Sequence, residues 1–107
     1  MIITTTGEVP GKRVVRTLGL VSGNIVRSRN IGRDVLAGLK NIVGGEIKEY
    51  TELMAMSRRD ALKRMAAEAE QMGANAIIEV RFVTAQVATT AAEILAYGTA
   101  VVVEDQL

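Results

Sequence analysis

The sequence contains no cysteine, no histidine and no tryptophan, and its only aromatic side chains are Tyr50, Phe82 and Tyr97. Without cysteine there is no disulfide, and without histidine there is no Ser-His-Asp, Cys-His or histidine–metal site. Soft heavy metals prefer thiolate and imidazole ligands, so their best donors are missing. The small number of rings for base stacking and an isoelectric point of about 8.1 argue against nucleic-acid binding.

The chain is short and rich in aliphatic residues. Its 107 residues are the length of one domain, so we expect a single domain over residues 1–107. Hydrophobic residues make up 49% of it, which is high for so small a chain. We therefore expect a homo-oligomer that buries apolar surface between subunits, with an aliphatic-rich monomer as the alternative.

Two sequence features bear on where the protein is found. Residues 1–6 lack the basic region and apolar run of a signal peptide. The chain also has no run of about 18 apolar residues that could span a membrane. We expect a cytoplasmic protein without membrane binding.

The net charge of +1 is unevenly distributed along the chain. Residues 1–33 carry six basic side chains and one acidic side chain, whereas residues 34–107 carry seven basic and eleven acidic ones. This polarity could steer an anion to one face, or it could join the basic half of one subunit to the acidic half of another.

Hydrophobic periodicity predicts an α+β fold in the order β-β-α-α-β-β, an antiparallel sheet with two helices packed on one face. Strands are expected at residues 2–6, 14–26, 76–83 and 94–103, the second as a strand pair or one long strand. Gly19 and Gly23 interrupt it, as at a bulge or a close backbone approach. Helices are expected at residues 35–43 and from residue 46 or 51 to residue 72, with Gly73 as the second helix's C-cap. Asp60 and Arg64, four residues apart, predict an ion pair on that helix.

An arginine-rich segment precedes the first predicted helix and is the main candidate site. The N-terminus of a helix favours anions, and arginine binds phosphate and carboxylate groups well. The candidate residues for a small anionic ligand are Arg27, Ser28, Arg29, Asn30, Gly32 and Arg33. Alternatively, the arginines hold subunits together by pairing with glutamates of a neighbouring subunit.

Carboxylates offer the other candidate site. Glu46, Glu49 and Glu52 follow one another at spacings of three and can share a helix face, where they could hold a divalent metal ion. A solvated or ion-paired face is the alternative. The helical methionines Met54, Met56, Met65 and Met72 are more typical of core packing than of a metal site.

No catalytic constellation can be recognised in the sequence, so we predict no catalytic residues and a protein that is not an enzyme. Glu93 and Tyr97 are the pair that an enzyme would use, because they share a strand face.

Several segments together resemble the YbjQ family, small bacterial proteins described as heavy-metal-binding but without an established function. The resemblance is carried by residues 26–46, by Gly45-Glu46-Ile47-Lys48-Glu49-Tyr50-Thr51, by Arg64-Met65 with Glu68-Ala69, by Gly73-Ala74-Asn75-Ala76, and by residues 92–101. It implies a dodecin-like subunit in an oligomeric ring, a homopentamer. Three functions stay open: binding of a metal or small anion at subunit interfaces, a purely structural ring, or an enzyme that uses Glu93 and Tyr97.

Overall fold

The computed structural model describes the backbone of residues 1–28, 42–43, 46–89 and 91–107, and the side chains of these residues except 42–50. Its elements are β1 (Ile2–Ile3), β2 (Lys12–Ser28), β3 (Ile42–Val43), β4 (Glu46–Ile47), α2 (Lys48–Gln71), β5 (Ala76–Ala88) and β6 (Ala91–Asp105). The main sheet has the strand order β1-β5-β6-β2, and β3 pairs with β4 in a separate ribbon.

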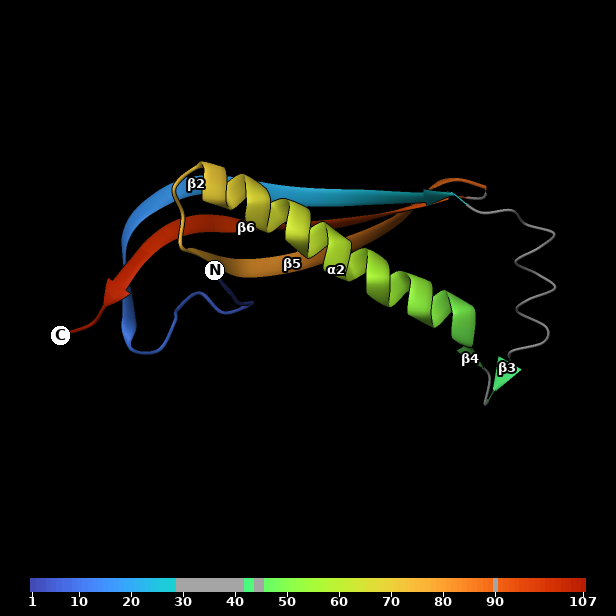
Figure 1. Cartoon of the computed structure of the whole chain (residues 1–107), viewed down its shortest axis with the longest axis horizontal. Coiled ribbons are helices and arrows are strands. Elements are labelled where there is room, and N and C mark those ends of the chain that lie inside the picture. The colour runs from blue at the N-terminus through green and yellow to red at the C-terminus, as the bar shows by residue number, and fades with distance from the viewer. Residues whose placement is uncertain (29–41, 44–45, 90) are drawn as a thin grey trace.

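Two long antiparallel ladders build the main sheet (Figure 1). β2 pairs with β6 along its length, from Lys12 opposite Asp105 to Ser28 opposite Ala91. β5 and β6 form a hairpin, and β1 joins the edge of β5 in parallel. A strand pair and one long strand were both open for residues 14–26, and the structure has one long strand there. The ladder shifts register at Gly19, whose φ of 126° suits glycine.

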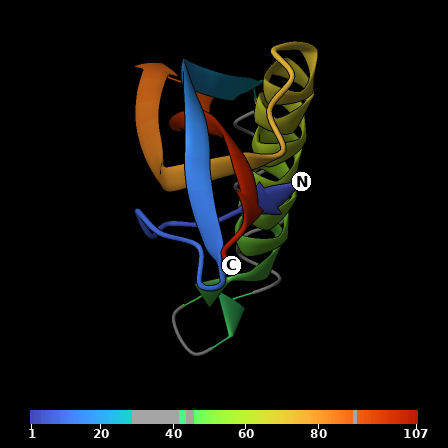
Figure 2. The same cartoon turned by 90° about the vertical axis from the view of Figure 1, so that its left-hand side faces the viewer.

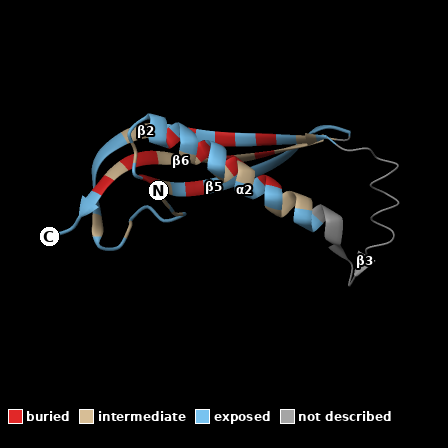
Figure 3. Ribbon diagram, viewed as in Figure 1, coloured by how far each residue is buried: buried red, intermediate tan, exposed pale blue. Residues whose placement is uncertain are grey.

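Helix α2 covers one face of this sheet (Figures 1 and 3). Ala61, Met65 and Ala69 recur every four residues, and each is fully buried. They share one core cluster with Val21, Ile25, Ile77, Val80, Ile94, Ala96 and Ala100 from the strands. The helix stops at Gly73, whose φ of 89° confirms the predicted C-cap.

Gly23 lies where α2 and β2 approach most closely. A Cβ atom built at this position would overlap the backbone carbonyl oxygen of Ala61, the backbone nitrogen of Met65 and the Arg64 side chain. The predicted close backbone approach is confirmed, because any side chain here would push the helix off the sheet.

A bulge interrupts the alternation of β5. Ile77 and Val80 are both buried although they are three positions apart, since the ladder shifts between Ile78 and Arg81. Glu79, with φ of 53°, is the extra residue in this bulge. The two-residue alternation of a regular strand is therefore broken at this point.

Among the described residues, α2 lies on one side of the sheet only and leaves the other face uncovered (Figure 2). Large aliphatic side chains are exposed on β2 and β5, namely Leu20 (72%), Val26 (54%), Val83 (46%) and Val87 (54%). The radius of gyration is 17.4 Å, whereas a compact domain of this length has about 13 Å. The described fold is thus a thin, extended layer rather than a closed core.

The predicted fold was wrong in its helices and in its sheet. The described residues contain one helix on a mixed sheet, because β1 runs parallel to β5. Most of the predicted helix at residues 35–43 lies outside the described residues, but its last two, Ile42 and Val43, form β3. Both are β-branched and favour strand geometry. The oligomeric ring in that prediction has no support in the structure.

Ion pairs join the two oppositely charged parts of the sequence within one chain. Lys12 pairs with Asp105 at 2.5 Å, Arg13 with Glu104 at 3.7 Å and Arg27 with Asp60 at 2.9 Å. Each pair takes its cation from the basic N-terminal third and its carboxylate from the remainder. The described helix is not long and apolar enough to cross a membrane.

We expect Gly23→Ala to lower the free energy of unfolding by about 3 kcal/mol, the upper part of the range for overpacking, because the added methyl group meets rigid helix backbone. Urea denaturation followed by circular dichroism measures the change. Ser22→Ala is the matched control, since Ser22 is exposed and lies next to Gly23 in the strand. Equal stability of both variants would contradict the close approach.

We expect Lys12→Met to raise the pKa of Asp105. The hydrogen bond from Lys12 and then its positive charge hold the pKa of this carboxyl below its usual value. Because the folded-state pKa is depressed, the pair stabilises the fold above the unfolded pKa, and this contribution is lost as pH falls through the folded pKa. Carboxyl ¹³C titration by NMR measures the pKa, and Arg16→Met serves as the control. An unchanged Asp105 titration would rule out the interaction.

Candidate functional site

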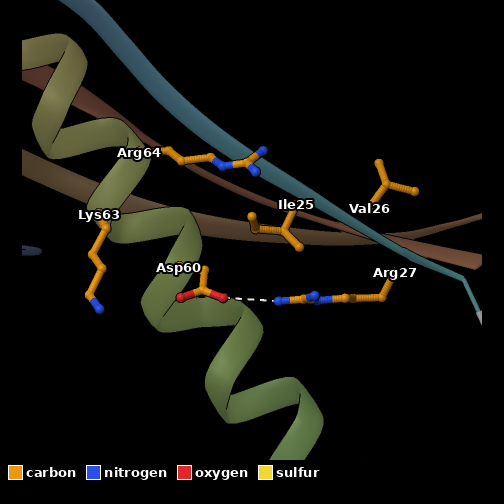
Figure 4. A pocket seen from close by; sticks show the side chains of 6 residues that line it. All are labelled: Ile25, Val26, Arg27, Asp60, Lys63 and Arg64. Atoms are coloured by element: carbon orange, nitrogen blue, oxygen red, sulfur yellow. Dashed lines mark hydrogen bonds and ion pairs between the residues drawn. The ribbon is translucent and has the colours of Figure 1, made fainter.

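A cleft lies between β2 and α2 and includes Arg27 of the predicted arginine site (Figure 4). Its volume is about 330 Å³, and it is lined by Ile25, Val26, Arg27, Asp60, Lys63 and Arg64. Three of these residues are cationic and one is anionic. The cleft therefore has an excess of positive charge.

Arg27 lies at the end of β2 and points at α2 (Figure 4). Its Nη2 atom donates to Oδ2 of Asp60 at 2.9 Å, and its Nε atom donates to Oγ of Ser57 at 3.2 Å. Ser57 is fully buried and donates to the carbonyl oxygen of Leu53 at 2.8 Å. Because Ser57 is fixed in this way, it holds the Arg27 guanidinium in one orientation.

Lys63 and Arg64 contribute the remaining positive charge. Arg64 donates from Nη1 to the carbonyl oxygen of Asn24 at 2.8 Å. Lys63 is exposed, and its ammonium group points away from the Arg27–Asp60 pair in Figure 4. Among the described residues, neither cation lies in an ion pair. A flexible lysine stem can still turn toward a bound anion.

The same stretch of helix also satisfies the free edge of β2. Alternate residues of a strand direct their backbone groups to opposite edges. Ser22 donates its backbone N–H to Oε2 of Glu68 at 3.1 Å, and the Asn24 carbonyl accepts from Arg64. These contacts occupy edge groups that could otherwise pair with another chain, and they fix the helix beside the cleft.

The structure describes only part of the predicted anion site. Arg27 lines the cleft and Ser28 is exposed at the end of β2. The others lie outside the described residues, namely Arg29, Asn30, Gly32 and Arg33. The anion site stays a prediction at those positions.

The helix residues of the cleft, Asp60, Lys63 and Arg64, were not predicted as site residues. Asp60 and Arg64 were expected to pair with each other on the helix surface. In the structure Asp60 instead pairs with Arg27, and Arg64 donates to the Asn24 carbonyl oxygen. Acidic and basic residues four apart predict a local pair equally well in any exposed helix. The only sequence signal for the cleft was the basic charge of residues 27–33.

The donor set does not fit a soft heavy metal. Among the described residues there is no cluster of three or more acidic, cysteine or histidine side chains. Met65 is fully buried in the core, and Met54 is eleven residues away, about 16 Å along the helix. Glu52 is exposed on α2, while the side chains of Glu46 and Glu49 lie outside the described ones. A metal site on these glutamates stays a prediction.

Glu93 and Tyr97 do not come together as a reactive pair. They share one face of β6, but four residues of strand span about 13 Å. Glu93 instead accepts a hydrogen bond from Nδ2 of Asn24 at 3.1 Å across the sheet. Their arrangement offers no support for an enzyme.

The fold and the cleft define a class: small α+β proteins with one long helix across a sheet of long strands and a basic cleft between them. The chain belongs to the YbjQ family, whose model, described as "Putative heavy-metal-binding", matches residues 1–104. The resemblance noted from the sequence is thereby confirmed.

Curated relatives from bacteria and archaea support the assignment. A UPF0145 protein of Dehalococcoides mccartyi is 55% identical over 104 residues, covering 97% of this chain and 100% of the relative. A UPF0145 protein of Archaeoglobus fulgidus is 57% identical over 101 residues, covering 94% of each chain. The expectation of a bacterial family was therefore too narrow.

A crystal structure from Pediococcus pentosaceus, described as a protein of unknown function of the DUF74 family, is similar in fold. Its TM-score is 0.70, with 15% sequence identity and coverage of 97% of this chain and 98% of that one. At this identity the likeness extends to the fold alone.

Proposed function

We propose that this protein is a non-enzymatic binding protein for a small anionic ligand, held in the cleft between β2 and α2. The observation that carries the proposal is the excess of positive charge around a fixed guanidinium. Arg27 is oriented by buried Ser57, and Arg64 and Lys63 have no carboxylate partner among the described residues. Arginine suits phosphate and carboxylate groups because its planar fork donates two parallel hydrogen bonds.

Further candidate residues from the sequence are part of the proposal. Arg29, Asn30 and Arg33 follow directly on Arg27 and Ser28 in the chain, so they are the additional donors that we propose for the same ligand. We also propose a cytoplasmic location. The metal prediction on Glu46, Glu49 and Glu52 is the weaker alternative, since a hard cation would need all three carboxylates.

We expect Arg27→Met to weaken phosphate binding at least tenfold, because the oriented donor is lost while Ser57 keeps its bond to Leu53. Isothermal titration calorimetry with inorganic phosphate in low salt measures the affinity. Lys63→Met should give a smaller loss. Equal affinity in all variants would place any phosphate elsewhere on the surface.

Arg58→Met is the matched control for these variants. Arg58 is exposed on the same helix, and two residues from Asp60 it lies about 160° around the helix axis from it. The Arg58→Met substitution removes one positive charge but changes no residue that lines the cleft. Weakening by Arg58→Met as strong as that by Arg27→Met would show that only the overall charge matters.

Association with further copies of the chain is a second proposal, supported by the uncovered face of the sheet. This face exposes large aliphatic side chains, and their exposure to water is unfavourable. They are Leu20 and Val26 on β2 and Val83 and Val87 on β5. The radius of gyration of 17.4 Å also exceeds that of a compact domain. A homo-oligomer that covers this face could be purely structural or could complete the anion site. Arg27 already pairs within its own chain, so it is less suited to clamp a neighbour.

We expect native mass spectrometry at micromolar concentration to show a homo-oligomer, and Leu20→Glu to shift it toward monomer. A charge on the sheet face would have to be desolvated at the interface. Met56→Glu is the control, since Met56 is 50% exposed on α2 rather than on the open face. A wild-type monomer at all concentrations would overturn this proposal.

A further inference from the structure

Asp60 occupies the place at Arg27 where an anionic ligand would bind. Its Oδ2 atom accepts from Nη2 of Arg27 at 2.9 Å. Figure 4 shows the carboxylate and the guanidinium pointing at one another across the cleft. A phosphate or carboxylate that binds the guanidinium through two parallel hydrogen bonds would use Nη2 as one of its donors. Such a ligand and Asp60 would then compete for this nitrogen.

We propose that Asp60 is a built-in competing anion, and that a compact oxyanion of the phosphate type enters the cleft by displacing it from Arg27. This inference rests on the proposed anion-binding function and adds the exchange step to it. Asp60 carries one negative charge, whereas a phosphate group at neutral pH carries more and presents three strong acceptor oxygens. The displacing ligand can therefore bond Arg27 and reach the other cleft cations as well.

The exposure of the pair makes the exchange feasible. The side chains of Arg27 and Asp60 are 37% and 36% exposed, so water screens the ion pair and keeps it weak. A released Asp60 carboxylate is solvated instead of being trapped in the core. The resting contact thus lowers a ligand's affinity by no more than about tenfold, which opposes anions that bind weakly.

Ser57 keeps the receptor in place during the exchange. Its Oγ atom accepts from Nε of Arg27, a different donor from the one that Asp60 uses. Ser57 is fully buried and anchored to the Leu53 carbonyl, so this contact does not depend on Asp60. When Asp60 leaves, Arg27 stays oriented. Ligand binding therefore does not have to order this long side chain, and the entropy loss on binding is smaller.

Asp60→Asn is the decisive variant, because asparagine keeps the shape and removes the competing charge. We expect it to bind inorganic phosphate about five- to tenfold more tightly than wild type in calorimetry. Glu70→Gln is the matched control: it changes the net charge equally but lies ten residues, about 15 Å, further along α2. It should leave the affinity within twofold of wild type.

A direct readout in the wild type accompanies the affinities. During a phosphate titration, the carboxyl ¹³C signal of Asp60 should move to the position of a solvated aspartate, while the Nε–H signal of Arg27 remains visible. A static Asp60 signal at saturation would overturn the displacement.

The outcomes separate the two proposals. If the wild type binds phosphate and Asp60→Asn binds it with equal or weaker affinity, the competition is overturned and the proposed anion site stands. Binding by Asp60→Asn alone would refute the function in the wild type and support the competition. No binding by either protein would refute both.

Discussion

The close approach of α2 to β2 at Gly23 is the constraint on which the rest of the structure depends. Only a residue without a side chain allows the helix backbone at Ala61 and Met65 to rest on the strand. This contact sets the height of the helix above the sheet. It therefore decides which helix side chains can reach the strand, and in particular which of them reach its free edge.

The polar contacts between α2 and β2 follow from that height. Glu68 and Arg64 reach the outward backbone groups of Ser22 and Asn24, and Asp60 reaches Arg27. One row of helix side chains thus both closes the edge of β2 and lines the basic cleft. The cleft and the edge are built from the same interaction, so a change in helix height would alter both.

The description of the family and the chemistry of this chain point in different directions. The family is described as heavy-metal-binding, yet the chain has neither cysteine nor histidine. Met54, Met56 and Met65 are spread along α2, and Met65 is fully buried in the core. Cationic side chains repel a metal ion and attract an anion. The residues that line the cleft therefore favour an anionic ligand over a soft metal.

The sequence predicted what depends on local pattern. A strand over residues 14–26, a long second helix that ends just before Gly73, and a special role for Gly23 follow from hydrophobic spacing and glycine placement. The prediction failed at Ile42 and Val43, which fit a helical stripe but pair with Ile47 and Glu46 in a short antiparallel ribbon. It also failed at β1, which runs parallel to β5 through contacts between distant segments that no local pattern encodes.

The candidate site divides in the same way. By itself the sequence excluded thiolate and imidazole chemistry, and it indicated the basic segment to which Arg27 belongs. Only the tertiary structure decided that Asp60 faces Arg27 and that Arg64 holds the edge of β2. The reason is physical. Asp60 and Arg64 are spaced so that they could pair with each other on the helix. Because β2 lies close to this face of α2, each of them bonds to the strand instead.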